Sequence, residues 1–158
     1  MFSAKEQNAI NEKLALLGEF KRGEISSAGL ALSIARRRMS WIHRNLNELM
    51  QRYSYLPIEE RAHRIIFLEH MKIVPEHSEV VRVSPHKIRI NSYNFCPYLE
   101  ACNQLGLDTR YICQKIGEHS IQLMCRIISP NLYFSRNYDN IRPQSHEFCE
   151  EYIELKTQ

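Results

Sequence analysis

Apolar residues recur at helical spacing through the first 72 residues, and they alternate with polar residues in several short stretches of the remainder. Between Leu30 and Leu49 there is neither Gly nor Pro, so nothing in the sequence interrupts a helix there. This segment predicts one long amphipathic helix from Ser26–Ser27 to about Tyr53. Its apolar stripe comprises Ala31, Ala35, Met39, Ile42, Leu46 and Leu49.

Shorter helices are predicted on both sides of the long one. Ser3 and Glu6 have the spacing of a capping box, in which each side chain accepts a hydrogen bond from the other residue's backbone. Gly23 ends this first helix, because glycine readily adopts the left-handed conformation at a helix C-terminus. Pro57 begins a third helix in "YLPIEERAHRIIFLEHM", whose apolar face holds Ala62, Ile65 and Ile66.

Beyond Val74-Pro75 the pattern changes to an alternation of period two. "SEVVRVS" and "HKIRINSY" alternate in this way and meet at Ser84-Pro85-His86, which predicts a β-hairpin. "NLYFSRNY" and "HEFCEEYIEL" predict two further strands, the last of which begins at His146.

Two helices are predicted between these pairs of strands. "CPYLEACNQLGL" forms a short helix that Gly106 closes, and Asp108 caps the longer helix "TRYICQKIGEHSIQLMCRII". The inward positions predicted for the longer helix are Ile112, Ile116, Leu123 and Ile127. The chain is therefore predicted to be α+β: a single domain, 1–158, in which a helical arm, 1–72, packs on a small antiparallel unit of ββααββ order, 73–158.

Composition and charge narrow the classes of function. Net charge is +3, and the first 72 residues hold twelve Lys/Arg against eight Asp/Glu, an excess too small to indicate a nucleic-acid partner. No apolar run approaches the roughly 18 residues of a membrane span. The five cysteines are odd in number and no secretory signal precedes them, so we expect free thiols and a cytoplasmic protein. No pair of cysteines has the C-x2-C spacing of a zinc site, so neither a metal nor another cofactor is predicted.

Cys96 is the candidate for chemistry. Pro97 favours the first position of a helix, which makes Cys96 the N-cap of "PYLEACNQL". A thiol there faces unpaired backbone N–H groups and the positive end of the helix dipole, both of which favour the thiolate. The alternative is a small buried residue in a turn. A base is not evident, because His86 is predicted at the far end of the strand that leads to Cys96.

A metal site is a second interpretation of the cysteines. Cys113, His119 and Cys149 would have to converge with Cys96 in space to form it. Cys113 has apolar neighbours along its helix, and Cys149 shares a strand face with Ile153, so core thiols are the favoured interpretation. We expect His119 on the solvent side of its helix.

Arginines near the predicted strands are candidates for binding a carboxylate. Arg136 lies in "YFSRNY" and Arg142 in the loop that follows, and a guanidinium matches a carboxylate in shape and charge. The alternative is an ion pair with the acidic last strand, "EFCEEYIE". The run "ARRRM" on the long helix points in three directions, which argues against a DNA-binding face.

The second half of the chain resembles a known family. A strand pair is followed by Cys-Pro opening a helix ("NFCPYLEACNQLGL"), a helix with an internal cysteine ("RYICQKIGEH"), "SPNLYFSRNY", and a strand with a last cysteine ("HEFCEEYIEL"). Over residues 78–155 this order resembles the L-2-amino-thiazoline-4-carboxylic acid hydrolase family, and more distantly the small ligand-binding domain named after vinyl reductase. The matched positions are Cys96, Cys113 and Cys149.

The resemblance implies a small hydrolase that cleaves a cyclic C–N bond in a small carboxylate substrate. Cys96 would be the catalytic residue, and Asn94, Arg136 and Arg142 are the candidate substrate-binding residues. The alternatives are a non-catalytic ligand-binding or sensory module and, less favoured, a DNA-binding regulator. The expected partner is a small-molecule ligand, and the N-terminal helices are a candidate surface for a homodimer.

Overall fold

A computed structural model describes residues 1–142 and 147–157, so His146, expected to begin the last strand, lies outside the described residues. The first half is helical: α1 (Ala4–Lys21), α2 (Ser27–Arg52), α3 (Ile58–His63) and its π-helical continuation η1 (Arg64–His70). A 3-10 turn, η2 (Pro75–His77), leads into β1 (Ser78–Ser84) and β2 (Lys87–Ser92). Next come α4 (Pro97–Leu105) and a helical run formed by α5 (Thr109–Tyr111), the π-helical η3 (Ile112–Gly117) and α6 (Glu118–Ile128). The last elements are β3 (Leu132–Arg136), the 3-10 turn η4 (Tyr138–Asn140) and β4 (Cys149–Leu155).

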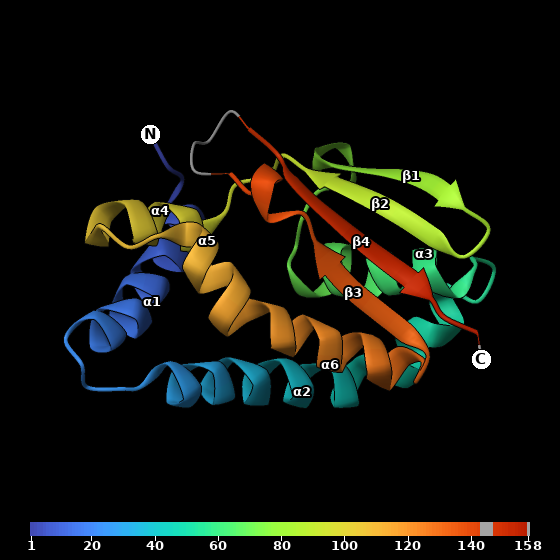
Figure 1. The fold of residues 1–158 in the computed structure, drawn as a ribbon, viewed down its shortest axis with the longest axis horizontal. Coiled ribbons are helices and arrows are strands. Elements are labelled where there is room, and N and C mark those ends of the chain that lie inside the picture. Colours follow the sequence, from blue (N-terminus) through green and yellow to red (C-terminus); the bar gives the residue numbers. More distant parts are fainter. Residues whose placement is uncertain (143–146, 158) are drawn as a thin grey trace.

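The fold is α+β, with one four-stranded antiparallel sheet in the order β1-β2-β4-β3. The last strand, β4, lies between β2 and β3. Helices α2 and α6 run side by side, and α6 packs against β3, while α1 and α4 pack together at one end of the molecule (Figure 1). None of the helices in the described part of the chain has the length and apolar character that crossing a membrane requires.

Several predicted helix boundaries are confirmed by local geometry. The Ser3 hydroxyl accepts from the Glu6 amide and the Glu6 carboxylate accepts from the Ser3 amide, so the capping box at α1 is present. Gly106 ends α4 in the left-handed conformation, with φ of 68°. The Asp108 carboxylate accepts from the Arg110 amide at the start of α5.

The predicted inward face of the helix 109–128 is right at its start and wrong at its end. Ile112 and Ile116 are buried, but Leu123 and Ile127 are only partly buried. The π-helical turn η3 adds one residue to the turn it occupies, which rotates the later positions around the axis by about one residue. The buried face therefore continues through Ser120, Ile121, Met124, Cys125 and Ile128.

The buried apolar residues form two clusters. One lies between the sheet and the helices beneath it, and its largest members include Phe67, Ile42, Ile65, Ile88, Ile90, Ile121 and Ile153. The other joins α1 and the first half of α2 to α4 and η3 through Leu17, Leu30, Ile34, Ala101, Cys102, Ile112 and Ile116. The N-terminal helices thus contribute to both clusters together with elements of the second half.

Candidate functional site

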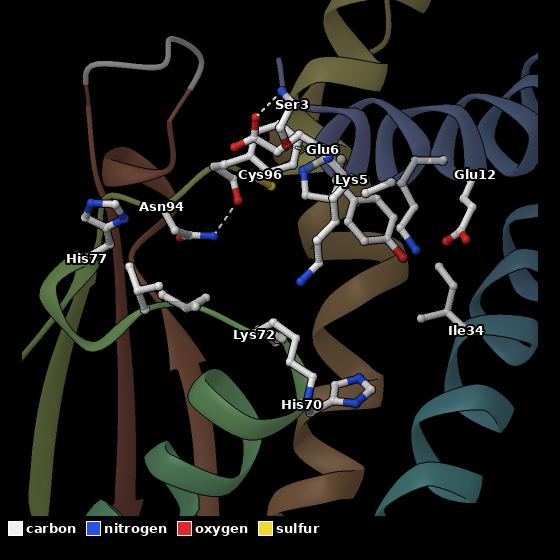
Figure 2. A pocket seen from close by; sticks show the side chains of 18 of the residues that line it. Ser3, Lys5, Glu6, Glu12, Ile34, His70, Lys72, His77, Asn94 and Cys96 are labelled. Carbon is white, nitrogen blue, oxygen red and sulfur yellow. Dashed lines mark hydrogen bonds between the residues drawn. The ribbon is translucent and has the colours of Figure 1, made fainter.

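A cleft of about 790 Å³ opens between α1, the middle of α2, the segment that follows η1, and the chain just before α4. The part that precedes α4 contributes Asn94, Phe95 and Cys96, so two of the sequence-predicted site residues line the same cavity. Figure 2 shows side chains converging on this space from α1 on one side and from η1, η2 and the chain before α4 on the other. Its size is within the range of small-molecule sites.

Cys96 is the N-cap of α4, as predicted, and Pro97 occupies the first helical position. Its backbone is extended, with φ of −121° and ψ of 108°, and its carbonyl accepts the first helical bond from the Glu100 amide at 3.2 Å. The sulfur makes no capping hydrogen bond. The half-buried side chain lies in the wall of the cleft.

The other four thiols are also free, but burial suppresses their ionisation. Burial raises the pKa of Cys102 to about 11 and the pKa of Cys113 to about 12. The pKa of Cys125 is raised to about 12 and that of Cys149 is also raised, in both cases chiefly by burial. Cys102 is fully buried and belongs to the apolar cluster that joins α1, α2, α4 and η3.

Asn94 is connected to the sheet by Arg142. The Arg142 guanidinium donates to the Asn94 carbonyl and side-chain oxygens and, through Nε, to the Cys149 sulfur at 3.3 Å. Arg142 is 4% exposed and does not line the cleft. The segment that precedes Cys96 is thereby held against β4.

Arg136 lies away from the cleft lining and has a carboxylate partner within the chain. Its Nε donates to Glu151 Oε2 at 2.9 Å, and its Nη1 donates to the Cys113 carbonyl at 3.0 Å. Burial alone would lower the pKa of the guanidinium, but the buried Glu151 carboxylate raises it above its ordinary value. The ion pair with the acidic last strand, the alternative weighed from the sequence, is therefore present.

Cations predominate among the charged residues of the cleft. Two glutamates, Glu6 and Glu12, are accompanied by five lysines and arginines: Lys5, Lys13, Arg37, Arg38 and Lys72. Within residues 1–142 and 147–157, no ion pair joins any of these seven side chains to another charged group. The Glu6 carboxylate instead accepts from the Ser3 amide.

His70 lies at the base of the cleft with its ring 4.6 Å from that of Trp41. Burial, together with the positive charges of Arg38, Lys13 and Lys72, lowers the pKa of His70 to about 4. These cations come from three separate segments of the chain, so no single sequence motif predicts that they lie together. Arg38 lies in the run "ARRRM", where nothing in the local pattern distinguishes it from Arg36 and Arg37.

His119, a further candidate from the sequence, does not line the cleft. His119 is exposed on α6, as predicted. In the described part of the chain no three His, Cys, Asp or Glu side chains are grouped so as to hold a metal ion. His77, in contrast, lines the cleft beside the sheet, although the sequence singled out only His86 as the nearest histidine to Cys96 (Figure 2).

The chain was compared with protein-family models, curated proteins and solved structures, and none of them matches it. The resemblance to the thiazoline-carboxylate hydrolase family therefore stays a prediction from sequence.

Proposed function

We propose that this protein binds a small organic molecule in the cleft, with Cys96 in the wall of the binding site. The observation that carries the proposal is the cavity of about 790 Å³ that is lined by Cys96 and Asn94. Ligand sites are typically mostly apolar with a few directed polar groups. The cleft has this character, because Leu16, Ile34 and Phe95 share its wall with the charged residues.

Capture of disulfide-bearing fragments by Cys96 tests this proposal directly. Under mildly reducing conditions a fragment stays attached only where its body also binds near the thiol. We expect the folded protein to retain a small chemical subset of a fragment library at Cys96, at several times the level of the unfolded chain. Intact-mass spectrometry and peptide mapping measure both the extent and the position of capture.

The matched control is Cys96→Ser, which should abolish retention. A second reference is the urea-unfolded chain, in which the thiol reacts without a surrounding pocket. Uniform capture of all fragments by the folded protein, regardless of their chemistry, would show that the cleft does not select a ligand and would refute the proposal.

A second candidate function, hydrolysis of a cyclic C–N bond, is favoured by one observation: the thiol in the cleft lies at a helix N-terminus. In the reaction implied by the resemblance, the Cys96 thiolate adds to the ring carbon and forms a C–S bond. The ring nitrogen leaves with a proton as the C–N bond breaks. Water then adds to the same carbon and the thiolate departs, so that the net change is addition of water. His77 is the cleft residue suited to carry the proton.

Thiol reactivity tests whether Cys96 is suited to this chemistry. At pH 7.5, iodoacetamide should alkylate Cys96 at least about tenfold faster than each of the other four cysteines, because their raised pKa values leave little thiolate. Peptide mapping of a time course gives the five rates. The hydrolase candidate fails if the five thiols react together, and only after the protein has unfolded.

A further inference from the structure

We infer that the base of the cleft binds a doubly charged acidic group of the ligand, such as a phosphoryl group or a pair of carboxylates, through Arg38, Lys72 and Lys13. The inference rests on the proposed function, since it names the class of ligand that the same cleft accepts. It also assigns anion binding to residues other than Arg136 and Arg142, whose guanidinium groups already have partners within the chain.

Arg38 is a partly buried cation without a carboxylate. It extends from α2, and its Nη1 donates to the Ser120 hydroxyl at 2.8 Å. No carboxylate lies within ion-pair distance of it in residues 1–142 or 147–157. Burial lowers the pKa of this guanidinium, which means that the charged form is poorly solvated where it stands. A bound anion would supply the missing countercharge.

Lys72 and Lys13 bring two more positive charges to the same place. Both line the same cleft as Arg38 and His70. The positive charge of each of the three cations contributes to the lowered pKa of His70. Lys13 also lies over the Tyr98 ring, with Nζ 4.8 Å from the ring centre. Figure 2 shows Lys72 and His70 together at this end of the cavity. Three cations around a neutral imidazole favour a group of charge −2 over a single carboxylate.

The backbone at Lys72 is unusual for a lysine. Its φ is 60°, the left-handed region that favours glycine, and it is bracketed by the hydrogen bonds from the Met71 amide to the Ile66 carbonyl and from the Ile73 amide to the Phe67 carbonyl. A side chain at such a position costs folding free energy. Glycine would therefore relieve local strain while it removes the ammonium group, which makes Lys72→Gly a variant suited to separate binding from stability.

The remainder of the lining restricts the rest of the ligand. Apolar side chains, including Leu16, Ile34 and Met71, border the cationic base. The ligand class is therefore a small organic acid that carries its doubly charged group at one end of an apolar body.

The indole N–H of Trp41 is a suitable NMR probe of anion binding at the base of the cleft. Trp41 is the only tryptophan in the chain and its ring contacts that of His70, so its indole N–H gives one identifiable NMR signal beside the proposed site. Inorganic phosphate, malonate and acetate are titrated separately at pH 7.5 and constant ionic strength. We expect saturable shifts with phosphate or malonate and binding of acetate weaker by about tenfold. Comparison of phosphate with malonate tells a phosphoryl ligand from a dicarboxylate.

Substitutions identify the residues responsible. Arg38→Gln and Lys72→Gly should each weaken the binding of the doubly charged probe by on the order of tenfold, whereas Arg36→Gln, two residues away on α2 and outside the cleft, should leave it unchanged. Lys72→Gly should retain or raise the melting temperature. Unchanged affinity in both cleft variants would overturn the inference, and so would the absence of a saturable shift with either dianion.

This result is separable from the proposed function. If neither dianion binds but Cys96 still selects fragments, the anion site is wrong while the binding cleft stands. If the dianions bind as expected but Cys96 captures fragments without selection, the anion site at the base stands, while the proposal of a selective ligand site around Cys96 is refuted.

Discussion

Replacement of Arg136 by alanine is expected to lower the free energy of unfolding by about 3–5 kcal/mol, because it leaves a buried carboxylate without its partner. The Arg136 and Glu151 side chains are 10% and 6% exposed, and they face each other across β3 and β4. Arg136 also satisfies the Cys113 carbonyl, so the substitution removes a second hydrogen bond. Urea denaturation of the wild type and the variant measures the difference.

The matched control is Arg22→Ala. Arg22 forms an ion pair with Glu24 at 2.8 Å, close to the 2.9 Å between Arg136 and Glu151. Both side chains of the Arg22 pair, however, are more than half exposed. Solvent and salt screen exposed pairs, so little change is expected there. An equal loss of stability in the two variants would contradict burial as the source of the effect.

A double variant distinguishes the ion pair from the space that it fills. Arg136→Met combined with Glu151→Leu removes both charges together, and most of the lost stability should return. The same protein tests the sequence-based prediction that Arg136 binds a substrate carboxylate. Loss of selective capture at Cys96, at restored stability, would support that role.

The second large effect is expected for Arg142→Ala, at about 2–3 kcal/mol of unfolding free energy. The guanidinium is buried and donates to both Asn94 oxygens and to the Cys149 sulfur, so its removal leaves several acceptors without a donor. Because Asn94 lies two residues before Cys96, we also expect the cleft wall to loosen. Arg142→Lys keeps the charge but loses the planar fork, so its effect should be intermediate.

Hydrogen exchange separates the local effect of Arg142→Ala from the global one. The amides of Tyr93 and Glu100 donate to the His77 and Cys96 carbonyls on either side of Asn94. They should lose protection by more than the change in global stability accounts for, and fragment selection at Cys96 should weaken in parallel. If these amides change only as much as those of the core strand β2, Arg142 stabilises the fold without positioning the cleft wall. That outcome would contradict the local part of the prediction.

Features that depend on a few neighbouring residues were predictable from the sequence. The capping box of Ser3 and Glu6, the end of α4 at Gly106 and the position of Cys96 before Pro97 are all correct. In each case the hydrogen bond or dihedral angle concerned lies within about three residues of the side chain that specifies it. The α+β class and the hairpin after Pro75 follow from periodicity in the same way.

Predictions that extend a pattern over many turns were less accurate. Leu123 and Ile127 lie off the buried face because η3 inserts a residue, and no Gly or Pro signals that insertion before Gly117. Strand register is likewise difficult to predict from a local pattern. Arg136 faces Glu151 only because β4 returns to pair between β2 and β3, so the partner of this arginine could not be named from spacing.

By itself, the sequence determined the class of fold, the helix ends and the one thiol that stands at a helix N-terminus, since all of these are set by local backbone chemistry. Only the tertiary structure decided which residues accompany that thiol. Lys13, Arg38, Lys72 and His77 come from four different segments and share no spacing, and they meet at one cleft because α1, α2 and the chain beyond η1 pack around it. Long-range packing, which has no periodicity of its own, thus assembled the charges of the candidate site.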